Sequence, residues 1–120
     1  MKEELDLVKK FHKKFNALIS DKPSLIPEDR VVLRHRLMKE EVEEYLIGAK
    51  KGDIENIAKE LTDVLYTVYG TIIEHGLQDR MEKIFQEVHR SQMSKDYHQY
   101  KMIKGKNYTE ADIKKIIKSK

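Results

Sequence analysis

The 120-residue sequence predicts an all-α fold, a helical bundle built around one antiparallel helix hairpin. Glycine and proline are sparse, at five and two residues, which favours long helices over many short strands. Apolar residues recur at spacings of three and four through most of the chain, as in helices that bury one face. This length suits one hydrophobic core, so we expect residues 1–120 to form a single domain.

Composition excludes several classes of protein. Cysteine is absent, which excludes disulfides and thiolate metal sites. The N-terminal segment has no long apolar run, so we expect no signal peptide, no membrane span and a cytoplasmic location. The centre of the chain is acidic, whereas the tail from His89 onward is basic. An acidic centre favours a hard cation and a basic tail favours phosphate, although solvated helix faces also account for this asymmetry.

Three long helices are expected in the first two thirds of the chain. The first covers residues 3–19 and is followed by a loop with two prolines. The second covers residues 27–50 and stops at Gly52, because glycine favours the left-handed C-cap conformation. Asp53 then caps a third helix that reaches about residue 76. The expected buried residues of the first two helices are Leu5, Val8, Phe11, Phe15, Leu18, Val31, Met38, Val42, Tyr45, Leu46 and Ala49.

The third predicted helix is apolar over much of its circumference between Leu61 and Ile73. Such a helix lies centrally in a core or is shared between subunits, so we expect a homodimer or homotetramer. A fourth helix is expected over residues 79–93, and residues 95–108 lack helical periodicity. Thr109 and Asp112 resemble a capping box, which predicts a short last helix.

Two pairs of acidic residues stand on the helices that flank Gly52. Glu41 and Glu44 are three residues apart, as are Glu60 and Asp63, so each pair lies on one helical face. Both pairs lie at a similar distance from the turn. With a rise of about 1.5 Å per residue, they should come level across an antiparallel hairpin.

The orientation of these acids follows from their neighbours. The residue after the first acid of each pair, Val42 or Leu61, belongs to the expected buried stripe, so both pairs should flank the buried face. Four converging carboxylates repel one another and need a cation, and all-oxygen ligands suit Mg²⁺, Mn²⁺ or Ca²⁺ better than zinc. A di-iron site would require Glu-x-x-His on two helices, and no glutamate here has histidine three residues later.

At these residues the sequence resembles the all-alpha NTP pyrophosphohydrolase superfamily, in its MazG-like and phosphoribosyl-ATP pyrophosphohydrolase-like branch. The hallmark of that superfamily is E-E-x-x-E followed by E-x-x-D, which here reads Glu40-Glu41-Val42-Glu43-Glu44 and then Glu60-Leu61-Thr62-Asp63. Further similar segments extend the resemblance over about residues 8–117.

The resemblance implies a function and a set of site residues. Mg²⁺, with Mn²⁺ as an alternative, would be bound by Glu41, Glu44, Glu60 and Asp63, and Glu40 would activate the attacking water. The substrate would be a nucleoside triphosphate, a deoxynucleoside triphosphate or a related nucleotide, and the products would be its monophosphate and pyrophosphate. The usual assembly of the relatives is a dimer or a dimer of dimers.

Four residues are candidates for substrate binding. Arg34 lies seven residues before Glu41 on nearly the same helix face, where it can meet a phosphate or pair with a nearby acid. Gln92 stands where relatives generally have an asparagine linked to the nucleotide. Lys95 and Lys104 are candidate phosphate contacts, with solvated lysines as the alternative.

The alternative function is a non-catalytic helical module that binds a nucleotide or a partner. A module that used the basic tail would bind nucleic acid in a salt-sensitive way. That function leaves the two registered acid pairs unexplained, so we do not expect nucleic acid as a partner. Because the N-terminal segment has no long apolar run, we do not expect a membrane as a partner either.

Overall fold

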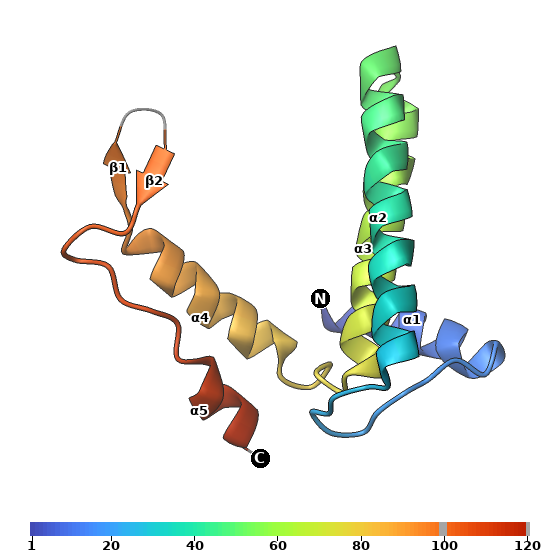
Figure 1. Cartoon of the computed structure of the whole chain (residues 1–120), viewed down its shortest axis with the longest axis horizontal. Coiled ribbons are helices and arrows are strands. Elements are labelled where there is room, and N and C mark those ends of the chain that lie inside the picture. The colour runs from blue at the N-terminus through green and yellow to red at the C-terminus, as the bar shows by residue number, and fades with distance from the viewer. Residues whose placement is uncertain (99–100, 120) are drawn as a thin grey trace. The chain divides into compact units, whose positions relative to one another are not determined.

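The computed structural model describes residues 1–98 and 101–119 and is mostly helical, which confirms the predicted all-α class (Figure 1). Two short strands pair in antiparallel register, with Tyr97 opposite Met102. Within the described residues, no helix has the length and apolar character needed to cross a membrane. The elements in chain order are α1 (Lys2–Lys14), α2 (Glu28–Lys51), α3 (Ile54–Glu74), α4 (Met81–Met93), β1 (Asp96–His98), β2 (Lys101–Ile103) and α5 (Ile113–Lys118).

The chain divides into two compact units, residues 1–78 and residues 79–120. In the first unit α2 packs along α3, and α1 packs against α3. In the second unit α5 packs against α4, and β1 pairs with β2. The expectation of a single domain over residues 1–120 stays a prediction.

The α2–α3 hairpin follows the local signals in the sequence. Gly52 adopts the left-handed conformation, with φ of 72°, and its N–H donates to the carbonyl of Ala49 at 3.1 Å. Asp53 caps α3, because its side chain accepts hydrogen bonds from the N–H groups of Glu55 and Asn56. The two long helices lie side by side as a hairpin (Figure 1). The predicted caps at Gly52 and Asp53 are therefore confirmed.

A buried cluster of charges joins the N-terminal part of α2 to the C-terminal end of α3. The Glu74 side chain is fully buried, and its carboxylate accepts hydrogen bonds from Nε and Nη2 of Arg30 at 2.9 and 2.7 Å. Nη1 of Arg34 forms a second ion pair with Glu74 at 3.1 Å. Gly70 provides the space, because a Cβ atom at this position would collide with the Arg34 guanidinium and His12. This unit therefore combines a small apolar core with a fully paired buried acid.

The expected buried stripe of α2 is only partly confirmed, because Met38, Tyr45 and Ala49 are half-buried. Val31, Val42 and Leu46 keep 45%, 50% and 45% of their surface exposed. The buried positions of α2 are Arg34 and Gly48 instead. A polar and a small residue thus take the most buried positions of α2, and Val31, Val42 and Leu46 are left toward solvent.

The first helix is shorter than predicted. It ends at Lys14 rather than residue 19, and Asn16 has a positive φ of 54°, which ends the helical path. The expected burial of Phe11 and Phe15 is also wrong, because they are 44% and 61% exposed. The inward side chains of α1 are Leu5, Val8 and His12.

In the second unit, the end of α4 is tied to the segment before α5. Ser91 is buried, and its hydroxyl donates to the carbonyl of Thr109 at 2.8 Å. The cap of α5 is Asp112, whose side chain accepts from the N–H of Lys115. The expected capping box at Thr109 is therefore wrong, although the short last helix is confirmed. The N–H of Thr109 donates instead to the hydroxyl of Ser94 at 2.9 Å.

Candidate metal centre

Three carboxylates from the two facing helices converge on the α2–α3 hairpin. Glu41 comes from α2, whereas Glu60 and Asp63 come from α3, and one oxygen of each lies within 4.8 Å of the others. Glu60 is buried, and Glu41 and Asp63 are half-buried. The spacing of three residues places Glu60 and Asp63 on one face of α3. The hairpin brings Glu41 level with them, as the sequence predicts.

Their orientation differs from the sequence expectation in an informative way. Val42 and Leu61, the apolar residues beside the acids, are 50% and 47% exposed. The sequence predicts that the acids flank a buried stripe containing these two residues. In the structure the acids turn toward the partner helix, and the apolar neighbours turn outward. The carboxylates therefore face one another at close range, which strengthens both their repulsion and their capacity to bind a cation.

The electrostatics of the cluster favour a cation. Burial raises the pKa of Glu41, and the charges of Asp63 and Glu60 raise it further. The nearby ammonium group of Lys59 partly opposes this shift in the pKa of Glu41. Lys59 donates a hydrogen bond from Nζ to Oδ2 of Asp63 at 2.7 Å. This contact is the main cause that raises the pKa of the Lys59 ammonium group.

The donor set fits a hard divalent ion. All three candidate ligands are carboxylates, and one of them is buried. Carboxylate oxygens are the ligands that Mg²⁺ and Mn²⁺ take in proteins, often with water completing the coordination. The three side chains present therefore suit Mg²⁺ or Mn²⁺, and they lack the nitrogen or sulfur donors typical of zinc sites.

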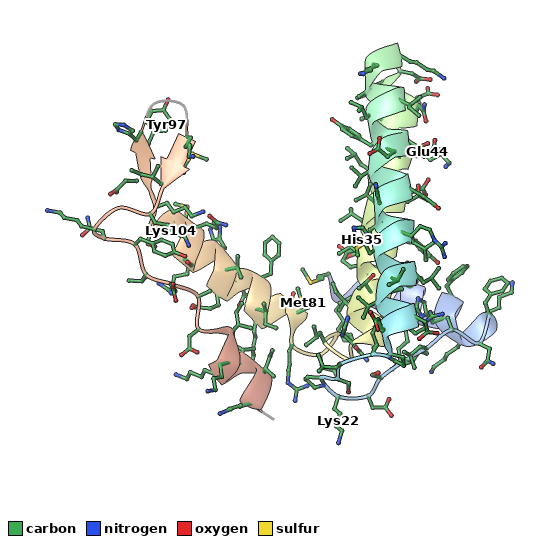
Figure 2. All side chains as sticks on the ribbon, in the orientation of Figure 1. Lys22, His35, Glu44, Met81, Tyr97 and Lys104 are labelled. Atoms are coloured by element: carbon green, nitrogen blue, oxygen red, sulfur yellow. The ribbon has the colours of Figure 1, made fainter. Side chains whose placement is uncertain are left out.

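The remaining motif acids lie outside this group of three. Glu44 is exposed on α2, one turn after Glu41 (Figure 2). Its charge contributes to the raised pKa of Glu41, so it lies near the cluster, but its oxygens are not among those that converge. Glu40 is exposed and precedes Glu41 on the same helix. The metal-binding role of Glu44 and the catalytic role of Glu40 stay predictions.

Arg34 takes part in the buried charge cluster. Nε donates to Oγ1 of Thr71 at 3.1 Å, Nη2 donates to the carbonyl of Thr67 at 2.9 Å, and Nη1 pairs with Glu74. Burial is the main cause that lowers the pKa of its guanidinium, whereas Glu74 opposes that shift. Of the two alternatives for Arg34, the ion pair is present, and it is buried rather than on the surface. A phosphate contact by Arg34 stays a prediction.

The other three candidates for substrate binding lie in the second unit. Gln92 is exposed near the end of α4, and Lys95 is half-buried just after it. Lys104 is exposed, and its Nζ lies 5.2 Å from the centroid of the Tyr108 ring (Figure 2). Such a cation–π contact orients a lysine side chain. Their roles toward a substrate stay predictions.

Sequence reasoning did not single out two features of the first unit. Lys59 could have been found from its spacing, because it precedes Asp63 by four residues and so shares its helical face. The Arg30–Glu74 pair joins residues 44 positions apart, and helical spacing within one segment gives no signal for it.

The fold and this cluster define a helical protein with an all-carboxylate site across a hairpin. The chain matches the family model of phosphoribosyl-ATP pyrophosphohydrolase over residues 8–92, which is well over half of its length. The protein therefore belongs to this family, a member of the all-alpha NTP pyrophosphohydrolase superfamily. Membership implies a pyrophosphohydrolase activity in general. The comparison with curated proteins finds no matching relative.

The matched segment contains the whole candidate site. It includes all of α2 and α3, and thus Glu41, Glu60 and Asp63. It ends at Gln92, so the strands and α5 lie beyond it. The family assignment therefore concerns the α2–α3 hairpin far more than the C-terminal segment.

Proposed function

We propose that the protein is a divalent-metal-dependent nucleotide pyrophosphohydrolase. It would cleave a nucleoside triphosphate, a deoxynucleoside triphosphate or a related nucleotide to the monophosphate and pyrophosphate. The observation that carries this proposal is the convergence of Glu41, Glu60 and Asp63 within 4.8 Å. Among the described residues, Lys59 is the only ion-pair partner of these three acids, so most of their negative charge is left for another cation.

Glu41, Glu60 and Asp63 hold the ion in this proposal, with Glu44 as a fourth ligand. A bound Mg²⁺ or Mn²⁺ neutralises phosphate charge and lowers the pKa of a coordinated water. Glu40 accepts the proton of the attacking water, whose oxygen forms a new bond to phosphorus. The bond between the α-phosphate and the β-phosphate breaks, and pyrophosphate leaves. Glu40 is exposed on the same helix as Glu41, so its carboxylate is open to solvent.

The remaining predicted roles concern the substrate. Gln92, Lys95 and Lys104 contact the nucleotide, and the lysines would pair with its phosphates. Arg34 supports the site indirectly in this account, because its guanidinium joins α2 to Thr67, Thr71 and Glu74 of α3. This bridge fixes the helices on which the carboxylates stand.

Exposed apolar side chains on both hairpin helices support a homodimer or homotetramer. Leu61, Leu65 and Tyr66 of α3 are 47%, 49% and 38% exposed, and Val42 and Leu46 of α2 are similarly exposed. Scattered exposed apolar residues are normal, but Val42 and Leu46, like Leu61 and Leu65, are four residues apart and share one face of their helix, and larger exposed apolar patches mark interfaces. We therefore propose that this face is buried between subunits, in a protein of the cytoplasm.

A substrate panel tests the reaction. The protein is incubated with Mg²⁺ and separate canonical and modified nucleotides, including dUTP and phosphoribosyl-ATP, and the products are resolved by chromatography. We expect monophosphate and pyrophosphate from at least one substrate. Glu40→Gln should lose rate but keep nucleotide affinity, because a general base acts mainly in the transition state. Glu60→Gln should lose metal-dependent binding as well as rate.

Glu55→Gln is the matched control, because Glu55 is an exposed residue on α3 outside the cluster. Its rate should equal that of the wild type. Release of orthophosphate alone would contradict a pyrophosphohydrolase. Tight metal-dependent nucleotide binding without turnover of any substrate would support the non-catalytic binding module instead.

A further inference from the structure

Lys59 lies on α3 with its ammonium group against the carboxylate cluster. Nζ lies 2.7 Å from Oδ2 of Asp63 and 3.9 Å from Oε1 of Glu60. The Lys59 side chain is 69% exposed, whereas those of Glu60 and Asp63 are 10% and 34% exposed. The solvent-facing ammonium group of Lys59 therefore already donates to one carboxylate oxygen of the cluster, Oδ2 of Asp63.

Stabilisation of the helix accounts for only a small part of this contact. A lysine placed four residues before an acid is the less favourable order of an i,i+4 pair, because the helix dipole opposes it. The contact instead joins the lysine to a carboxylate that has two further acids beside it. Its main electrostatic consequence is to offset part of the repulsion among Glu41, Glu60 and Asp63.

The same contact opposes a metal ion. A divalent ion ligated by Asp63 either takes the oxygen to which Nζ donates or sits close to the ammonium group, where two positive charges repel each other. Lysine has a flexible stem and a strongly hydrated head, and exposed ion pairs contribute little stability. The Lys59 side chain can therefore leave the cluster without disturbing the helices.

We propose that Lys59 is a resident counter-cation of the cluster, held against Asp63 and Glu60 until a divalent ion displaces it. This inference rests on the proposed metal centre and adds a residue that acts through the ligands. Lys59 stabilises the three acids in the metal-free protein and, by competing with the ion, weakens metal affinity. It is a positioning residue for the site rather than a metal ligand.

Calorimetric titration with Mn²⁺ at constant ionic strength tests this role in the full chain without nucleotide. Lys59→Met should bind Mn²⁺ about fivefold more tightly than the wild type, because the competing charge is gone. Lys59→Arg keeps the charge and should stay within about twofold of the wild type. Lys39→Met is the matched control: Lys39 is exposed on α2 near Glu41, and it forms no ion pair among the described residues.

Melting temperatures supply a second readout. Metal-free Lys59→Met should melt below the wild type, because the acids lose their counter-charge, and it should gain more on addition of Mn²⁺. A purely structural lysine would lower the melting temperature without tightening metal binding. Equal or weaker Mn²⁺ binding by Lys59→Met would overturn the role of Lys59. If the wild type bound no Mn²⁺, the metal centre itself would be contradicted instead.

Discussion

Each unit of the chain contains an arginine–glutamate pair, but the two pairs lie in opposite environments. In the first unit Glu74 is fully buried and is held by Arg30 and Arg34. In the second unit Arg90 is half exposed, and its guanidinium donates to both oxygens of Glu87 at 2.7 and 2.9 Å. A buried charge is costly without its partner, whereas an exposed charge returns to water. The same chemistry therefore fixes a helix pair in one unit and fastens a surface segment in the other.

The two units also differ in charge. Residues 1–78 contain 13 lysine and arginine residues against 15 acidic ones, a formal charge of −2. Residues 79–120 contain 11 against six, a formal charge of +5. The acidic unit holds the converging carboxylates, and the basic unit holds Lys95 and Lys104. A cation site in the first unit and phosphate contacts by Lys95 and Lys104 stay predictions.

Neutralising Glu74 should have the largest effect on stability. Glu74→Gln leaves the guanidinium of Arg34 buried without its counter-charge, which should lower the free energy of unfolding by about 3 kcal/mol. Urea unfolding followed by circular dichroism measures the loss. Glu43→Gln is the control, because Glu43 is exposed on α2 and forms no ion pair among the described residues. A loss no greater than that of the control would show that the buried Glu74 stabilises the fold no more than an exposed acid does, and it would contradict the difference between the two units.

Removing Arg90 should have a smaller effect. Arg90→Ala deletes the contacts to Glu87 and two further hydrogen bonds, to Oγ1 of Thr109 at 2.6 Å and the carbonyl of Glu110 at 2.9 Å. Water replaces these contacts, so we expect a loss clearly below that of Glu74→Gln. The loss should shrink further at high salt, because exposed ion pairs are screened. An Arg90→Ala loss as large as that of Glu74→Gln in the same urea assay would contradict this difference.

Acid titration should separate two carboxyls with opposite shifts. Arg90 lowers the pKa of Glu87 from 4.5 to about 2, so the stability that ionised Glu87 provides is present above 4.5 and lost as pH falls through about 2. The pKa of Glu41 is raised, so its ionisation costs stability as pH rises through its folded-state value.

Glu41→Gln and Glu87→Gln test these signs in the metal-free protein. At neutral pH, Glu41→Gln should raise the melting temperature, because it removes a repelling charge. Glu87→Gln should lower it, and this loss should fade toward pH 2. The melting temperatures are recorded across the pH range without divalent ions. Changes of the same sign at neutral pH would show that the two carboxyls do not differ as described.

Local signals in the sequence predicted much of the fold. Gly52 and Asp53 predict where α2 ends and α3 begins, because a left-handed C-cap and an N-cap side chain depend on neighbouring residues alone. The matching positions of Glu41 on α2 and of Glu60 and Asp63 on α3 follow from the constant rise per residue of a helix. Of the four carboxylates that the sequence predicts to converge, Glu41, Glu60 and Asp63 do so, whereas the oxygens of Glu44 lie outside the group.

Packing between residues far apart in the sequence limited what else could be predicted of the fold. Hydrophobic periodicity predicts Val42 and Leu46 on the inner face of α2, yet Arg34 and Gly48 are the buried residues of that helix. Hydrophobic periodicity cannot distinguish a face that packs within the chain from a second apolar face, and the buried arginine depends on a glutamate 40 residues later. The strands β1 and β2 have three residues each, too few for an alternating pattern to identify them.

The central claim is that Glu41, Glu60 and Asp63 form a divalent-metal site. Electron paramagnetic resonance of free Mn²⁺ tests it most directly, because bound ions leave the sharp free-ion signal. The wild type and the Glu55→Gln control should deplete that signal, and the variant combining Glu41→Gln, Glu60→Gln and Asp63→Asn should not. Circular dichroism must show that the triple variant remains helical. Equal depletion of free Mn²⁺ by the folded triple variant and the wild type would contradict the account.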